Sequence, residues 1–205
     1  MTDHSSEINR SQLSLDWALE GFNRYRSEQT SWIHFNREKP YIDHHDPISI
    51  YHNALYILAL MKTRQVANMQ EALRLLDHLL KFRHEGKFPS YLHSYPFVKQ
   101  GGMQIDLLAP FYQIEKRLPA GPLKEELGEV MAQLVAGVSP RDELEAFKIA
   151  CFAHASKGEG DIPPIELKSS AEMGEALAFA SLVQGEFYSN FFKRILSHFH
   201  LPTAQ

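Results

Sequence analysis

The sequence predicts an all-α fold of about eight helices, packed as antiparallel inner and outer hairpins. No stretch of the chain alternates apolar and polar residues over the length of a strand, whereas apolar residues recur three and four positions apart in most segments. Loops rich in Pro, Gly and aromatic residues separate these segments. A length of 205 residues predicts one domain, 1–205, of which the polar residues 1–10 are expected to be disordered.

The first three expected helices differ in how much of their surface is apolar. Residues 11–29 have one apolar stripe and predict an amphipathic helix, which the loop 30–46 follows. Asp46 precedes a proline and has the residue type of a helix N-cap, so a second helix is expected over residues 47–64. That helix is apolar on all faces and is expected to be buried. The third, residues 69–84, has a charged face and is expected on the outside.

The second half of the chain continues in the same way after the loop 85–102. Residues 103–118 are almost entirely apolar, and Pro110 predicts either a helix start near 109 or a kink. An amphipathic helix is expected over residues 123–136, and another after Ser139–Pro140. The last two helices are expected at residues 170–184 and 186–200.

Composition excludes several classes of function. With 44% hydrophobic and 22% charged residues, the chain is expected to form a packed core. The net charge is −4 and no stripe of Lys and Arg occurs, so no nucleic-acid partner is expected. The longest charge-free stretch of the first half, residues 47–61, is too short to cross a membrane. The N-terminal residues lack the pattern of a secretory signal. Cys151 is the single cysteine and is expected to be a packed thiol, so the sequence favours the cytoplasm.

The order of outer helix, long loop, inner helix and short turn recurs after about 55–60 residues, which would bring both long loops to one rim. This alternation over residues 11–136, with Gly86, Phe88 and Pro89 in a turn after a leucine-rich helix, resembles the α/α-toroid (six-hairpin) superfamily. That superfamily includes many glycoside hydrolases and polysaccharide lyases. The resemblance implies a substrate cleft formed by the long loops and the N-termini of the inner helices. About eight helices make an incomplete toroid, so an open arc, a part of a longer protein or an irregular helical bundle is expected.

Tyr91, His93 and Tyr95 alternate along the second long loop. In an extended segment their side chains would point to one side, where Tyr91 and His93 would act as a general acid/base pair and Tyr95 would stack on a sugar. In the alternative, both tyrosines cover the core and His93 faces water.

Asp106 is the lone charge on an inner helix, so its carboxylate must be paired, must cap a helix or must face the cleft. It is the third predicted catalytic residue, and the same reasoning applies to Glu175. Glycoside hydrolysis requires two carboxylates at a fixed separation. The residues expected to bind substrate are Trp32, His44, His45, Tyr95 and Gln104.

The segment from Asp43 to Asp46 contains two carboxylates and two histidines, which are metal ligands in phosphohydrolases of the HD type. The remaining histidines do not complete such a ligand set, and no metal or cofactor is predicted. The function expected is that of a carbohydrate-active enzyme, hydrolase or lyase, or a degenerate relative that binds an oligosaccharide. The alternatives are a non-catalytic helical scaffold that binds a protein and an HD-like metal phosphohydrolase. The sequence predicts no oligomeric state.

Overall fold

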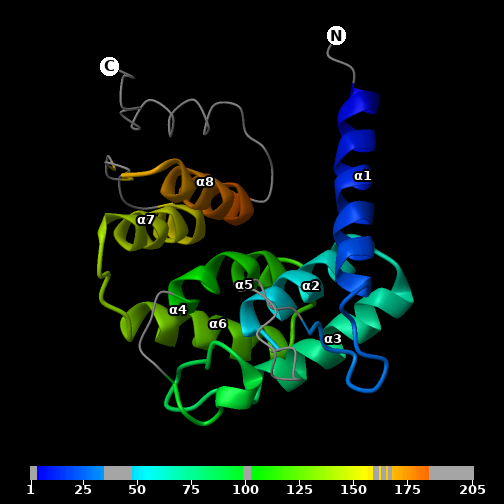
Figure 1. Cartoon of the computed structure of the whole chain (residues 1–205), viewed down its shortest axis with the longest axis horizontal. Coiled ribbons are helices and arrows are strands. Elements are labelled where there is room, and N and C mark those ends of the chain that lie inside the picture. The colour runs from blue at the N-terminus through cyan, green and yellow to red at the C-terminus, as the bar shows by residue number, and fades with distance from the viewer. Residues whose placement is uncertain are drawn as a thin grey trace, which may run out of the picture. The chain divides into compact units, whose positions relative to one another are not determined.

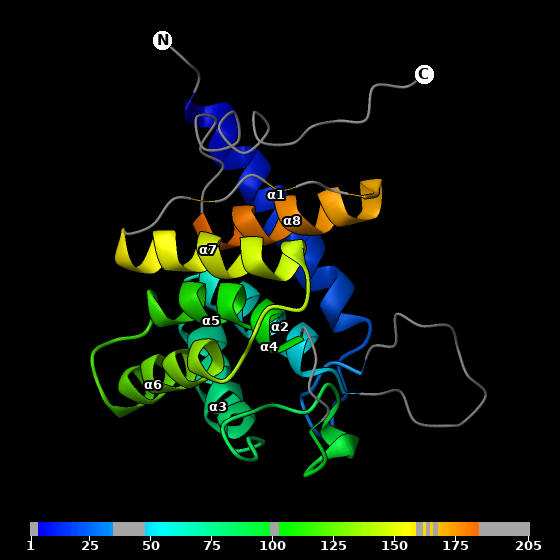
Figure 2. The same ribbon diagram turned by 90° about the vertical axis from the view of Figure 1, so that its left-hand side faces the viewer.

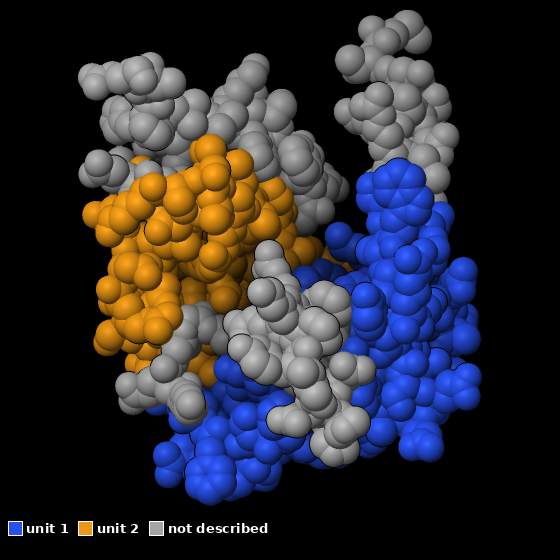
Figure 3. All heavy atoms as spheres, viewed as in Figure 1, with its two compact units in different colours: residues 1–99 blue, residues 100–205 orange. Residues whose placement is uncertain are grey.

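The computed structural model describes residues 4–34, 48–98, 103–158 and 168–184, together with Ile162 and Ile165. Every regular element among these residues is a helix, which confirms the all-α prediction (Figure 1). The chain divides into two compact units, residues 1–99 and 100–205 (Figure 3), and each is described by itself. The single domain therefore stays a prediction. No helix in the described part of the chain is long and apolar enough to span a membrane.

The first unit contains helices α1 (His4–Asn23), α2 (Ile50–Lys62) and α3 (Val66–Leu80) and the short 3-10 helix η1 (Leu92–Ser94). As predicted, α2 is buried over most of its surface, and α3 buries only its leucine-rich face. The predicted N-cap, Asp46, lies outside the described residues. The side chain of Ser49 caps α2, because its hydroxyl accepts a hydrogen bond from the backbone N–H of His52.

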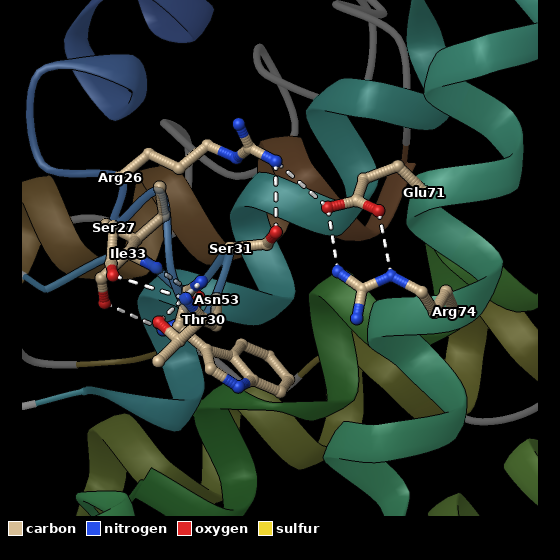
Figure 4. A network of polar contacts seen from close by, with 9 residues as sticks. Arg26, Ser27, Thr30, Ser31, Ile33, Asn53, Glu71 and Arg74 are labelled. Atoms are coloured by element: carbon tan, nitrogen blue, oxygen red, sulfur yellow. Dashed lines mark hydrogen bonds and ion pairs between the residues drawn. The ribbon is translucent and has the colours of Figure 1, made fainter.

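Helix α1 begins before residue 11 and ends at Asn23, six residues earlier than predicted. The chain then folds back on itself, with an isolated bridge between Arg26 and Ile33. Asn53 of α2 stabilises this turn: its Oδ1 accepts from Ile33 N at 2.8 Å, and its Nδ2 donates to Ile33 O at 3.0 Å (Figure 4). The same Nδ2 also donates to Ser49 O at 2.8 Å. A buried polar side chain must be satisfied in this way, so Asn53 fixes the position of Ile33.

The second unit contains helices α4 (Met103–Asp106), α5 (Leu108–Glu115), α6 (Pro122–Ala136), α7 (Glu143–Lys157) and α8 (Ser170–Gln184). The expected break in residues 103–118 is confirmed and lies at Leu107, between α4 and α5. Pro110 has no N–H for the carbonyl of Asp106 four residues before it, and its ring crowds that carbonyl. Helix α8 has the bounds that the sequence predicts, and the expected helix 186–200 lies outside the described residues.

Helices α7 and α8 lie side by side (Figures 1 and 2) and begin with the same arrangement of hydrogen bonds. At α7, Asp142 accepts from Glu145 N, while the Glu145 carboxylate accepts from Arg141 N. At α8, the Ser169 hydroxyl accepts from Glu172 N, while the Glu172 carboxylate accepts from Lys168 N. Both starts are variants of the capping box. The cap at Asp142 explains why α7 begins there and not directly after Pro140.

Candidate functional site

Three charged side chains from three helices meet in the second unit. Lys148 of α7 donates through Nζ to Oδ1 of Asp106, the last residue of α4, at 2.6 Å. The same nitrogen also donates to Oε1 of Glu175 on α8. We call Asp106, Lys148 and Glu175 the charged centre. One ammonium thus bridges two carboxylates that are 69 residues apart, the separation of 106 and 175 in the sequence.

The three side chains differ in exposure in a way that separates their roles. The Lys148 side chain is 3% exposed, whereas those of Asp106 and Glu175 are 30% and 55% exposed. The ammonium of Lys148 also lies 5.8 Å from the centroid of the Phe179 ring, one turn beyond Glu175 on α8. Lys148 is therefore the buried member of the charged centre, and both carboxylates reach solvent.

Burial and charge act in opposite directions on the protonation of this centre. Burial raises the pKa of the Asp106 carboxyl, and the neighbouring Lys148 ammonium offsets only part of this effect. Burial opposes the charge of Lys148, but Asp106 and Glu175 outweigh it and raise the pKa of the ammonium. Lys148 is thus a permanent cation, while Asp106 holds a proton more readily than an exposed aspartate.

A second ion pair adjoins the centre at the start of α7. Arg141 donates from Nε to Oε1 of Glu145 at 2.9 Å, and its terminal nitrogen contacts the same oxygen. The hydrogen bonds from Arg141 lower the pKa of Glu145, whose side chain is only 6% exposed. Glu145 carries a negative charge that reaches Asp106 and adds to the rise of its pKa.

Local sequence explains why these groups converge. The break at Leu107 ends α4 at Asp106, so the carboxylate lies at the end of a helix. Lys148 is three and four positions before Cys151 and Phe152 and therefore shares their buried face. Cys151 is fully buried, which confirms the expected packed thiol, and this burial raises its pKa to about 12.

Asp106 is paired with Lys148, which is one of the alternatives expected for it, and Glu175 contacts the same ammonium. Gln104 also belongs to this unit and is 3% exposed, so its side chain is packed within the fold. Four other predicted site residues belong to the first unit: Trp32, Tyr91, His93 and Tyr95. Asp106 belongs to the second unit, so the structure does not bring these four to it. His44 and His45 lie outside the described residues. A cleft formed by the loops 30–46 and 85–102 stays a prediction.

The side chains of Tyr91 and His93 lie side by side, but the backbone between them is not extended. Leu92–Ser94 forms the 3-10 helix η1, so the segment is not extended. The rings of Tyr91 and His93 stack with centroids 5.5 Å apart and planes 11° apart. Tyr95 diverges from this pair and packs edge-on against Phe82, at 6.0 Å between ring centroids. The condition under which all three side chains would point to one side, an extended segment, is therefore not met.

Trp32 is 8% exposed and packs edge-on against Phe82 at 6.5 Å. A buried ring in this position contributes to the core of the first unit, so little of its face is open to a sugar. No group of three His, Cys, Asp or Glu side chains among the described residues is arranged to hold a metal ion. The HD-type hypothesis depends on His44 and His45, so it too stays a prediction.

Sequence reasoning missed Lys148 and Asn53. Both are polar residues on helical faces that are otherwise buried: Lys148 in register with Cys151 and Phe152, and Asn53 in register with Ile50 and Ile57. A polar residue at a core position of a helix is the signal that would have found each of them.

No protein-family model, curated protein or solved structure matches this chain. The resemblance to the α/α-toroid superfamily therefore remains an interpretation of the sequence pattern.

Proposed function

We propose that the chain is a glycoside hydrolase whose two carboxylates are Asp106 and Glu175. The observation that supports this proposal is the contact of both carboxylates with the same ammonium, that of Lys148. Each oxygen lies so close to the same nitrogen that the two oxygens are no more than about 5 Å apart. Carboxyl groups that act as acid and nucleophile in retaining glycosidases are about 5–5.5 Å apart, and those of inverting enzymes are farther apart.

The unequal burial of the two carboxylates assigns their roles in this proposal. Asp106 is the more buried, and burial raises the pKa of its carboxyl, which suits the role of the general acid. Glu175 is the more exposed, so it is the nucleophile that approaches the sugar from solvent. This assignment follows the general rule that unlike environments divide acid and nucleophile between two carboxyl groups.

The reaction proceeds in two steps. Glu175 bonds to the anomeric carbon while the glycosidic C–O bond breaks, and the proton of Asp106 moves to the departing oxygen. Water then attacks the anomeric carbon and gives its proton to Asp106, and the ester bond to Glu175 breaks. One water is consumed, and both side chains return to their first state. Lys148 stays protonated throughout and acts as a positioning residue for both carboxylates.

The proposal includes an α/α-toroid-like fold and a location in the cytoplasm. An α/α-toroid-like arc would bring the loops 30–46 and 85–102 to one rim, where they would form a cleft. The buried thiol of Cys151 is compatible with the reducing cytoplasm.

The experiment is the release of reducing ends from a mixed set of oligosaccharides by the wild type and three variants. Asp106→Asn and Glu175→Gln remove one role each, and each is expected to lower turnover at least about 100-fold. Asp77→Asn is the matched control, because Asp77 forms an exposed ion pair with Lys81 on α3. Equal rates for all four proteins, or no turnover by the wild type, would refute the proposal.

A protein-binding scaffold is the second candidate, and one observation favours it. Phe97 is 80% exposed and Tyr95, two residues before it, is 43% exposed. Exposed aromatic side chains are enriched where proteins bind partners. This candidate would be supported over the hydrolase if the chain binds a protein tightly, if Phe97→Ser abolishes that binding, and if no glycan is turned over.

A further inference from the structure

We propose that Ser49 and His52 form a catalytic pair that hydrolyses carboxylic esters. Both residues belong to the first unit, at the start of α2, whereas the charged centre belongs to the second unit. The proposal goes beyond the glycoside hydrolase and does not rest on it, because the two sites share no residue. The observation that carries it is the contact between a serine hydroxyl and an imidazole nitrogen.

The Ser49 hydroxyl contacts two nitrogens of His52. Its Oγ accepts from the backbone N–H at 3.3 Å and lies 3.0 Å from Nδ1 of the ring. When the ring proton is on Nε2, Nδ1 accepts the hydroxyl proton, so the serine has the hydrogen-bonded base that a nucleophilic hydroxyl requires. A serine that only caps a helix needs the first of these contacts and not the second.

Two aromatic rings lie beside this hydroxyl. Ser49 and Tyr91 form an isolated antiparallel bridge, and both have extended backbone. The two hydrogen bonds of the bridge, 2.9 and 3.2 Å long, join the residues on either side of this pair. The side chains of such a pair lie on the same face, with Cβ atoms about 4.5–5.5 Å apart. The Tyr91 ring stacks on His93, so the stacked rings form a wall next to Ser49.

The N-terminus of α2 favours the charge that develops in ester hydrolysis. Attack on a carbonyl carbon places negative charge on the carbonyl oxygen, and the positive end of a helix dipole stabilises such a charge. Ser49 is the N-cap of α2, a helix of 13 residues, and the first turn of this helix, residues 50–53, contains no acidic residue. The charge therefore develops next to the helix end, and no carboxylate of that turn opposes it.

The neighbours of Ser49 indicate the class of ester. Ser49 is 5% exposed, and His52 and Tyr91 are half-buried. The alcohol part of the substrate would lie against the stacked Tyr91 and His93 rings, where a flat or ring-shaped group gains most contact. The expected substrates are therefore esters of alcohols that contain a ring.

The reaction proceeds in two steps. Ser49 Oγ bonds to the carbonyl carbon as its proton moves to His52 Nδ1, and the bond from that carbon to the alcohol oxygen breaks as the same proton passes to the oxygen. Water then attacks the acyl-serine and gives a proton to His52, and this proton returns to Oγ as its bond to the acyl carbon breaks. One ester and one water yield a carboxylic acid and an alcohol.

The first test is labelling of the full wild-type chain with an alkyl fluorophosphonate, which bonds to a base-activated serine with loss of fluoride. The masses of the peptides locate the label, which is expected on Ser49. Ser169 is the matched control within the same chain, because its hydroxyl also caps a helix but accepts from Glu172 N, not from a histidine. No label on Ser49, or an equal label on Ser169, would overturn the proposal.

The second test is the release of acetate from benzyl acetate, glucose pentaacetate and ethyl acetate. Ser49→Asn keeps a capping side chain but removes the nucleophile, and His52→Gln removes the base. Each variant is expected to lower the release at least about 100-fold, whereas Ser169→Asn leaves it unchanged. Circular dichroism verifies that all three variants are folded.

The wild type is expected to hydrolyse the two ring-containing esters at least about threefold faster than ethyl acetate, and equal rates would overturn the assigned substrate class. Wild-type rates in Ser49→Asn or His52→Gln, or no hydrolysis of any ester by the wild type, would overturn the catalytic pair. Asp106→Asn is expected to leave ester hydrolysis unchanged, so failure of this proposal and failure of the glycoside hydrolase are observed separately.

Discussion

Lys148 Nζ lies 2.6 Å from Asp106 Oδ1, although the two residues are 42 positions apart in the chain. The lysine is buried, so the pair is more than a surface contact between long side chains. It joins the end of α4 to the middle of α7, and the second contact of Lys148 adds α8. The polar centre of the second unit is therefore also one of its structural links.

Lys148→Met is expected to lower the free energy of unfolding by about 2 kcal/mol, because two adjacent carboxylates lose the cation between them. This value lies below the cost typical of a fully buried pair, since Asp106 and Glu175 are partly hydrated. Urea unfolding measures it. The double variant Asp106→Leu/Lys148→Met is expected to recover most of the loss, because it removes the unmatched charge. A double variant as unstable as Lys148→Met would contradict this explanation.

Asn53→Ala is expected to destabilise the first unit by about 2–3 kcal/mol, because the buried backbone N–H and carbonyl of Ile33 both lose their hydrogen bond to the Asn53 side chain. Trp32 is the natural reporter, since it neighbours Ile33 and is 8% exposed. A Trp17→Phe background removes the signal of the other tryptophan, which is 71% exposed. The fluorescence of Trp32 is expected to shift to longer wavelength in Asn53→Ala, and an unchanged spectrum with unchanged stability would show that Asn53 does not fix the turn.

Glu71 predicts a specific dependence of stability on pH. Its hydrogen bond from Arg74, with a further one from Arg26 (Figure 4), lowers its pKa from 4.5 to about 2. A carboxylate with a lowered pKa in the folded state stabilises the protein above its unfolded pKa, and this stabilisation is lost as the pH falls from about 4.5 toward 2. The free energy of unfolding of the wild type is therefore expected to fall more steeply over this range than that of Glu71→Gln.

The difference between the two slopes isolates Glu71, because the other carboxylates titrate in both proteins. At pH 7, Glu71→Gln is expected to be less stable by about 1–2 kcal/mol, and the two proteins converge near pH 2. Parallel curves over the whole range would mean that the arginines do not stabilise the ionised form.

Arg64 occupies the left-handed region of backbone space, with φ of 58°, directly after the C-cap residue Thr63 of α2. Only glycine adopts this conformation without steric cost, and glycine is the usual residue at this position after a helix. Arg64→Gly is expected to raise the free energy of unfolding by about 0.5–1 kcal/mol. Gln70→Gly, at an exposed position inside α3, is the control and is expected to lower it by about 1 kcal/mol. Both changes are measured by thermal unfolding.

Periodicity predicted the helices well where each has a clear boundary residue. Pro110 predicted the break between α4 and α5, and the bounds of α8 agree with the sequence pattern. The predicted end of α1 was wrong, because the turn that follows this helix depends on Asn53, a residue distant in sequence. Local propensity contains no information on such a partner.

The candidate site was predicted in part for the same reason. A lone carboxylate on an apolar helix needs a partner, and this argument found Asp106 and indicated Glu175. It did not identify Lys148, because the partner's position depends on how α4, α7 and α8 pack. The condition of an extended segment from Tyr91 to Tyr95 is not met, because backbone hydrogen bonds such as Ser94 N to Tyr91 O at 2.9 Å form a 3-10 turn.

The proposed chemistry is tested most directly by trapping the intermediate on Glu175. The wild type is incubated with a 2-deoxy-2-fluoro glycosyl fluoride of the sugar that it releases from the oligosaccharide set, and the masses of its peptides are measured by mass spectrometry. The peptide that contains Glu175 is expected to gain the mass of one fluorosugar, and the same peptide of Glu175→Gln is expected to gain nothing. A label on another residue, or no label while the glycan is hydrolysed, would contradict the assignment of Glu175 as nucleophile and Asp106 as acid.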